Sequence, residues 1–247
     1  MNKRITQRIL TILLAISICG TVVSVGMYGY YKWQYIKNEQ ISAEVSKKYA
    51  NEVGETDFTN VFLKPDIDKI KKDIPDTVMW LYIPKIDLSE LVVQGKDDSF
   101  YLTHNEYKEY SRMGTVFLDS RNNQNIEENY LSFLFGHNSD NTKIRFSRFK
   151  ELEDFSGQYF YIYQNHKQYK FKMIDYLFVS PKTSLYTEGI TNAETFKKAL
   201  ATTNTSEDVI NSISDDKRYM ILVTCKTGWD TSQRRFIIGE LESTIEY

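Results

Sequence analysis

The chain has 247 residues, of which 31 are basic and 33 acidic, giving a formal net charge of −2. This balance, and the lack of a basic stripe with interleaved aromatic residues, argue against a nucleic-acid partner. The length suits one well-packed domain with an added anchor or tail. Tyrosine (18) and phenylalanine (14) are abundant, whereas proline is scarce (4), which favours β structure.

An uncharged run at residues 9–31 lies close to the N-terminus. As a helix, it is long enough to span a bilayer. A cleaved signal peptide would have a shorter apolar region and a small-residue cleavage site. A lipoprotein signal would place a small residue, not Ile18, before Cys19. We therefore predict that residues 9–31 are a signal anchor embedded in the lipid bilayer.

Basic residues predict the orientation of this anchor. Lys3, Arg4 and Arg8 precede the run and favour a cytoplasmic N-terminus, although Lys32 and Lys37 reduce the contrast. We expect a single-pass protein of the cell membrane with its main domain outside the cell. The predicted divisions are a basic tail (1–8), the anchor (9–31), a helical linker with N-terminal helices (32–75) and the main domain, a barrel (76–247).

The linker is predicted to hold helices at 42–55 and 66–74. After it, short apolar or alternating runs separated by turn residues predict strands at 78–83, 91–94, 115–118, 130–135, 159–163, 169–179, 219–224 and 235–241. This pattern is mainly β and indicates a closed antiparallel or mixed barrel of about eight strands. A helical insertion precedes the seventh strand. Its first helix is predicted to open with a capping box at Thr191. Its second is predicted to open at Ser206, with acidic residues in the first turn.

Cys225 is the only cysteine outside the predicted anchor, so an intramolecular disulfide there is excluded. It ends an apolar run, where a thiol can be both fixed and accessible. A thiol is mostly protonated at neutral pH and needs a neighbouring imidazole or guanidinium to become a good nucleophile. A buried, inert thiol is the competing interpretation.

Of the three histidines, His104 and His166 lie in polar segments that predict a loop and a hairpin turn. His137 instead follows Gly136 at the end of an apolar run, where a site residue would lie. On this evidence a structural role for His137 is as well supported as a catalytic one.

Arg234 and Arg235 open the last predicted strand. By alternation, Arg235 shares a face with Ile237 and Leu241, whereas Arg234 shares one with Phe236. This favours Arg235 as the inward residue unless a bulge reverses the order. A fixed guanidinium there could stabilise an oxyanion; a solvated strand edge is the alternative.

Together these segments resemble the sortase family, and within it class B. Leu222-Val-Thr-Cys225 is similar to the TLxTC signature, with Ile221 in place of the usual Thr. Phe135-Gly-His137 resembles the histidine motif, and Arg235 followed by Phe-Ile-Ile resembles the catalytic arginine. Further blocks that resemble class B sortases lie at 80–84, 92–97, 101–102 and 117–122. The resemblance runs from about residue 66 to 241.

The resemblance implies a transpeptidase on the outer face of a Gram-positive membrane that acts on surface proteins bearing a C-terminal sorting motif with a Thr. Cys225 would attack the Thr carbonyl and form a thioacyl enzyme. His137 would exchange protons with the leaving and incoming amines, and Arg235 would hold the oxyanion. An amine of the peptidoglycan precursor or cross-bridge would release the product. No metal and no organic cofactor are expected.

The resemblance also implies substrate-binding residues, namely Leu102, Asp98, Tyr186, Val223 and Thr224. Asp98 takes the place of an Asn, Val223 replaces a Ser, and Lys226 replaces an acidic residue. These departures leave the recognition motif open.

Other functions compete with this hypothesis. Papain-like enzymes have the reverse order of Cys and His, and the local cysteine signature of caspases is absent. A sortase-like enzyme that mainly hydrolyses its thioester would be a cysteine peptidase. A non-catalytic, membrane-tethered β-barrel binding module would keep Cys225 buried and unreactive toward an alkylating reagent.

Overall fold

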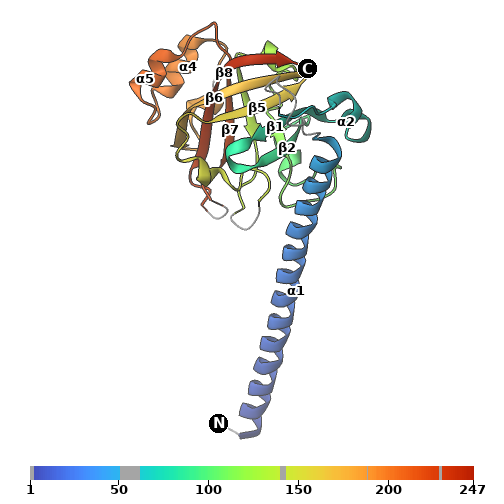
Figure 1. Cartoon of the computed structure of the whole chain (residues 1–247). Helices are drawn as coiled ribbons and strands as arrows, with labels where there is room; N and C mark the ends of the chain where they lie inside the picture. Colours follow the sequence, from blue (N-terminus) through green and yellow to red (C-terminus); the bar gives the residue numbers. More distant parts are fainter. Residues whose placement is uncertain (1–2, 51–61, 140–142, 188, 228–229) are drawn as a thin grey trace.

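The computed structural model describes residues 3–50, 62–139, 143–187, 189–227 and 230–247, and in it a closed barrel lies at one end of a long helix (Figure 1). The strands are β1 (Thr77–Ile83), β2 (Leu88–Val93), β3 (Val116–Leu118), β4 (Leu131–Phe135), β5 (Tyr159–Gln164), β6 (Lys167–Val179), β7 (Tyr219–Cys225) and β8 (Arg234–Glu246). The α-helices are α1 (Lys3–Tyr49), α2 (Ile67–Asp73), α3 (Ser184–Thr187), α4 (Ala193–Leu200) and α5 (Glu207–Ser212). The 3-10 helices are η1 (Pro84–Ile86), η2 (Phe100–Leu102), η3 (Ile126–Glu128) and η4 (Phe149–Leu152).

The barrel closes in the order β1-β2-β3-β4-β7-β8-β6-β5, which confirms the predicted fold. The β2–β3 and β4–β7 pairs are parallel and the other pairs are antiparallel, so the barrel is mixed. Alternation along β6 buries Tyr169, Phe171 and Met173 inside the barrel and leaves Lys172 exposed. The β4–β7 pair matters most for function, because it brings together segments about 90 residues apart in the chain.

Three buried clusters surround the strands. One fills the barrel interior and includes residues of all eight strands. A second lies between the outer face of β4, β7 and β8 and the helices α3 and α4. The third joins α1 and α2 to the outer face of β1, β2 and β3. Each strand near the site is therefore packed on both faces, which fixes its register.

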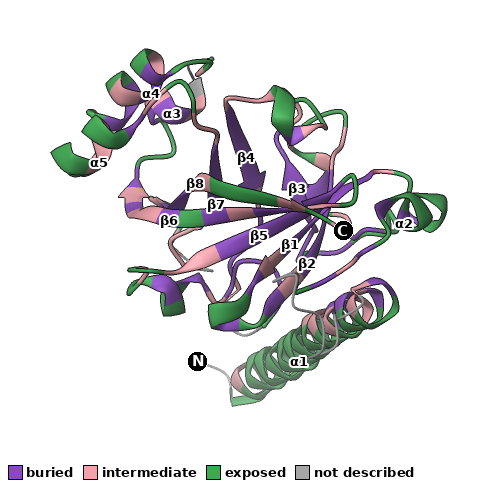
Figure 2. Ribbon diagram, turned by 45° about the horizontal axis from the view of Figure 1, so that its top comes forward, coloured by how far each residue is buried: buried purple, intermediate pink, exposed green. Residues whose placement is uncertain are grey.

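The helix α1 is continuous over 47 residues and has two different parts. Residues 7–30 are exposed throughout, and this part is apolar and long enough to cross a membrane (Figure 2). Beyond it, one stripe is buried against the barrel domain and consists of Gln34, Asn38, Ser42, Val45 and Tyr49. The helix predicted at 42–55 is present as far as Tyr49, and the segment 51–61 lies outside the described residues.

The helical insertion lies beside the barrel, on the side away from α2 (Figure 1). The prediction that Thr191 caps its first long helix was wrong by one residue. Asn192 is the N-cap of α4, because its side chain accepts a 2.9 Å hydrogen bond from the backbone N–H of Thr195. Ser206 caps α5 as predicted.

Candidate active site

Cys225 and His137 follow two strands that lie side by side. Along the parallel β4–β7 pair, Leu131 is opposite Tyr219 and Phe135 is opposite Val223. Continued by two residues, this register places His137 opposite Cys225. Parity also puts both on the outward face that carries Val223. Both side chains are half-buried.

Hydrogen bonds hold the ends of these two strands together. The Oγ1 of Thr224 donates to the carbonyl of Gly136 at 2.7 Å, and the N–H of Gly136 donates to the carbonyl of Val223 at 3.1 Å. The side-chain amide of Asn138 donates to the carbonyls of Cys225 and Lys226 at 3.1 and 3.2 Å. Sequence reasoning missed Asn138, although its place directly after the histidine motif was the available signal.

Among the described residues, the imidazole of His137 has one hydrogen bond, and that bond fixes its tautomer. Nε2 lies 2.7 Å from the carbonyl oxygen of Leu102. A carbonyl only accepts, so Nε2 carries the hydrogen and the neutral ring keeps its lone pair on Nδ1. Burial lowers the pKa of His137 and the charge of Arg145 acts in the same direction, while the Leu102 carbonyl opposes them. His137 is therefore a neutral imidazole at neutral pH.

The two arginines of β8 lie on opposite faces. Arg234 is opposite Cys225 in the β7–β8 pair, and Arg235 is opposite Thr224. Arg235 is 5% exposed and faces inward, as alternation predicted, with its Cζ 5.4 Å from the ring centre of Phe178. The structure therefore does not bring Arg235 onto the face of the ladder that carries Cys225.

The hydrogen-bonding states of these arginines also differ. Within the described part of the chain, Nε and Nη1 of Arg235 are buried without a partner. Nη1 of Arg234 donates to the carbonyl of Thr231 at 2.8 Å. Arg235 thus has buried donors free for a ligand, whereas Arg234 already braces the β7–β8 loop.

Tyr186 of α3 lies beside the proposed nucleophile. Its ring packs against Phe133, Phe135 and Phe236, at centroid distances of 6.0, 6.0 and 5.2 Å. Burial raises the pKa of Tyr186, and the nearby guanidinium of Arg234 opposes this. Its hydroxyl is buried and has no partner among the described residues. Tyr186 therefore lies close to Cys225 and Arg234, with a polar group directed into this region.

The other predicted substrate-binding residues have different surroundings. Leu102 is 38% exposed, and its carbonyl accepts the His137 hydrogen bond. Asp98 accepts a 2.7 Å hydrogen bond from the N–H of Ser120. Val223 and Thr224 are buried, at 2% and 3% exposure.

At these strand ends, a thiol and a neutral imidazole lie on one face of the ladder and the buried guanidinium of Arg235 lies on the other. These are the groups needed for acyl transfer through a covalent intermediate. Among the described residues, no group of three or more His, Cys, Asp or Glu side chains is placed to hold a metal ion.

Comparison with known proteins identifies the family. The Sortase domain family matches residues 81–242. The chain is 26% identical over 232 residues to sortase B of Staphylococcus aureus, covering 88% of this chain and 91% of that protein. The structure is similar to sortase B of Clostridium perfringens, with a TM-score of 0.61 and 27% identity over 71% of this chain and 99% of that chain.

A sortase B structure from Bacillus anthracis, 18% identical, shares the fold with a TM-score of 0.66, covering 87% of this chain and 99% of that chain. The family match spans more than half of the sequence and includes Cys225, His137 and Arg235. This chain belongs to the sortase family of cysteine transpeptidases.

Proposed function

We propose that the chain is a membrane-anchored class B sortase that cleaves a C-terminal sorting motif after Thr and transfers the surface protein to a cell-wall amine. Residues 9–31 cross the membrane with the N-terminus in the cytoplasm, and the barrel lies outside the cell. The observation that carries the proposal is the adjacency of His137 and Cys225 at the ends of two parallel, hydrogen-bonded strands.

In the first half of the reaction, the sulfur of Cys225 bonds to the Thr carbonyl carbon and its proton passes to His137. The C–N bond then breaks, and the leaving amine takes a proton from His137. In the second half, an amine of the peptidoglycan precursor or cross-bridge attacks the thioester and loses a proton to His137. The sulfur departs and is protonated again.

Arg235 is the proposed oxyanion donor, because its buried Nε and Nη1 have no partner among the described residues. Leu102, Asp98, Tyr186, Val223 and Thr224 are the proposed substrate-binding residues. Tyr186 has the strongest support, since its hydroxyl, which has no partner among the described residues, lies close to Cys225 and Arg234. Val223 and Thr224 have buried side chains, so they would contribute to substrate binding through their backbone and through the shape that they give to the end of β7.

The test uses the full chain in detergent with a library of Thr-containing peptides, and mass spectrometry to detect a thioacyl adduct. Wild type should form the adduct and, with an amine present, give the exchanged peptide. Cys225→Ala should form none. Cys19→Ala is the matched control, because it removes the only other thiol in the sequence. Adduct formation followed only by hydrolysis, at every amine concentration, would favour a peptidase instead.

A further inference from the structure

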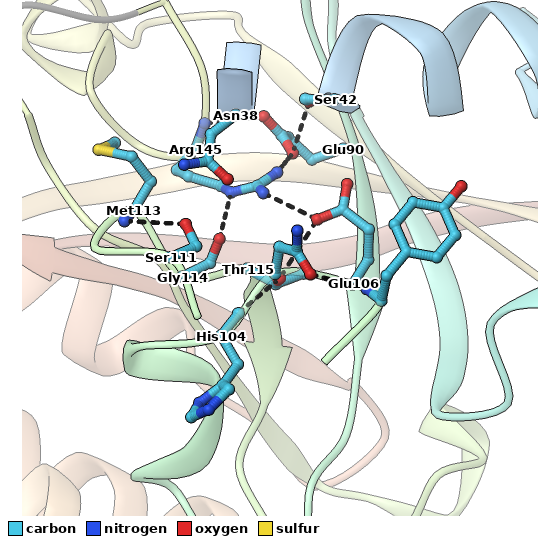
Figure 3. Close-up of polar contacts among 12 residues, drawn as sticks. Asn38, Ser42, Glu90, His104, Glu106, Ser111, Met113, Gly114, Thr115 and Arg145 are labelled. Atoms are coloured by element: carbon cyan, nitrogen blue, oxygen red, sulfur yellow. Dashed lines mark hydrogen bonds and ion pairs between the residues drawn. The ribbon is translucent and has the colours of Figure 1, made fainter. Parts of the chain in front are cut away.

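Figure 3 shows a charged cluster that has no role in the chemistry above. The guanidinium of Arg145 is 1% exposed and pairs with two buried carboxylates, Glu90 of β2 and Glu106. Its Nη2 lies 3.1 Å from Glu106, and its Nε donates to the carbonyl of Gly114 at 3.0 Å. The backbone N–H of Arg145 also donates to Glu90, at 2.7 Å.

Burying this cluster costs desolvation free energy. Three charges are removed from water, and buried ion pairs of this kind are often no more stabilising than apolar side chains of the same volume. Arg145 also has a φ of 57°, a left-handed conformation that costs a residue with a side chain of this kind on the order of 1 kcal/mol. Stability alone is therefore a poor explanation for the cluster.

The position of the cluster suggests a second explanation. The ring of His137 is hydrogen-bonded to the carbonyl of Leu102. The two residues lie on separate segments of the chain, one following β4 and the other preceding β3. Arg145 is on the histidine segment, where the N–H of Phe146 donates to the carbonyl of His137 at 3.0 Å. Gly114 follows Leu102 on the other segment. It packs so closely there that an added Cβ would lie 3.0 Å from the Leu102 carbonyl oxygen.

We propose that Arg145 is a positioning residue that holds the imidazole of His137 by clamping together the two segments joined by the His137–Leu102 hydrogen bond. The proposal rests on the proposed catalytic role of His137. The guanidinium of Arg145 bonds to Glu90, Glu106 and Gly114, so its effect on His137 would be transmitted through the backbone. Its bonds to Gly114 and Glu106 tie the histidine segment to the 103–115 loop, and its bonds to Glu90 tie both to the barrel.

The helix α1 covers this cluster, so its test needs the full chain. Ser42 donates to Glu90 at 3.4 Å, and Asn38 is buried beside Arg145 (Figure 3). Arg145→Met alone would leave two carboxylates buried without a cation and could unfold the protein. The informative variant therefore combines Arg145→Met with Glu90→Gln and Glu106→Gln. Arg148→Met is the control, because Arg148 lies three residues further on and pairs with the surface residue Glu151.

Two readouts are needed, both in a Cys19→Ala background. Selective 15N labelling of histidine reports which nitrogen of His137 carries the hydrogen, and the rate of alkylation by iodoacetamide reports the reactivity of Cys225. The triple variant should fold and unfold at a temperature close to that of wild type. His137 in this variant should no longer be purely the Nε2–H tautomer, and Cys225 should react with iodoacetamide about tenfold more slowly. Arg145→Lys should retain part of both properties, and Arg148→Met all of both.

A folded triple variant with the wild-type tautomer and wild-type alkylation rate would overturn the proposal. Failure of the proposed function looks different. In that case His137→Ala would leave the alkylation rate and peptide exchange unchanged, whereas the tautomer of His137 would still respond to the triple substitution.

Discussion

Thr224 and Gly136, the residues that precede Cys225 and His137, are joined by a 2.7 Å hydrogen bond from a hydroxyl to a buried carbonyl. The bond links the end of β7 to the residues that continue β4. The positions of the thiol and the imidazole therefore depend on each other. A side chain predicted to contact substrate thereby acquires a second, structural role.

The bond can be tested with Thr224→Val, which keeps the shape of the side chain and removes the hydroxyl. A buried carbonyl that loses its partner should cost about 1–3 kcal/mol in the free energy of unfolding. Peptide turnover should fall about tenfold or more, because the two groups lose their mutual alignment. Thr224→Ser is the control and should behave like wild type. If Thr224→Val keeps wild-type stability and only raises KM, the hydroxyl binds substrate instead.

The two arginines of β8 give a second prediction. Arg235→Ala should lower kcat/KM by about 10²–10³-fold, because it removes the buried donors proposed to hold the oxyanion. Arg234→Ala should lower it far less, since that guanidinium is already bonded to the loop. Steady-state kinetics on the two variants decide between them. The reverse ranking would transfer the role to Arg234, which lies opposite Cys225.

The barrel could be predicted from the sequence because its signals are local. Alternation and turn residues marked all eight strands, and the apolar runs that precede Cys225 and His137 placed both residues at strand ends. The sequence analysis predicted an anchor at 9–31 and a separate helix at 42–55, whereas α1 is continuous; the lack of Gly and Pro in residues 32–49 was the missed signal.

Side-chain networks could not be predicted in the same way. Arg145 and its partners Glu90 and Glu106 are 55 and 39 residues apart in the chain. Only the paths of two loops bring them together, and periodicity contains no information about those paths. The faces of Arg234 and Arg235 relative to Cys225 likewise depended on the β7–β8 register, which the loop length alone did not define.

The pH response of His137 gives a third prediction. Burial and Arg145 lower its pKa in the folded protein, so an NMR titration should find a value below the ordinary 6.5. The folded state thus disfavours the imidazolium. The stability associated with this residue is fully present above about pH 6.5 and is lost as the pH falls below it.

Unfolding at a series of pH values should therefore show a smaller acid loss in His137→Gln than in wild type. His166→Gln is the matched control, because His166 is an exposed residue of the β5–β6 hairpin turn. A measured pKa at or above 6.5 for His137 would contradict this prediction.

The membrane anchor gives a fourth prediction. Leu14→Arg combined with Val22→Arg places two charges in the exposed apolar part of α1. Inserting each charge near the bilayer centre should cost about 2.5–3.5 kcal/mol. The variant should leave the membrane fraction on alkaline extraction, and Ile36→Arg, beyond the predicted span, should not.

In intact cells, an impermeant maleimide should label Cys225 of wild type. Absence of labelling in a folded, active protein would reverse the proposed orientation.

Gly136 gives the last prediction, because the space beside it is already filled. An added Cβ would lie 2.8 Å from the ring of Phe146, which is fully buried and stacked on Phe149 at 4.2 Å. The ring cannot move away, so Gly136→Ala should destabilise the fold by about 1–3 kcal/mol and shift the neighbouring His137. Peptide turnover should therefore fall more than stability alone explains.

Gly189→Ala is the control for Gly136→Ala, since no heavy atom lies within 4 Å of its added Cβ. Adding Phe146→Leu to Gly136→Ala frees space and should restore part of the activity. If the single variant is as active as wild type, the position of His137 does not depend on this contact.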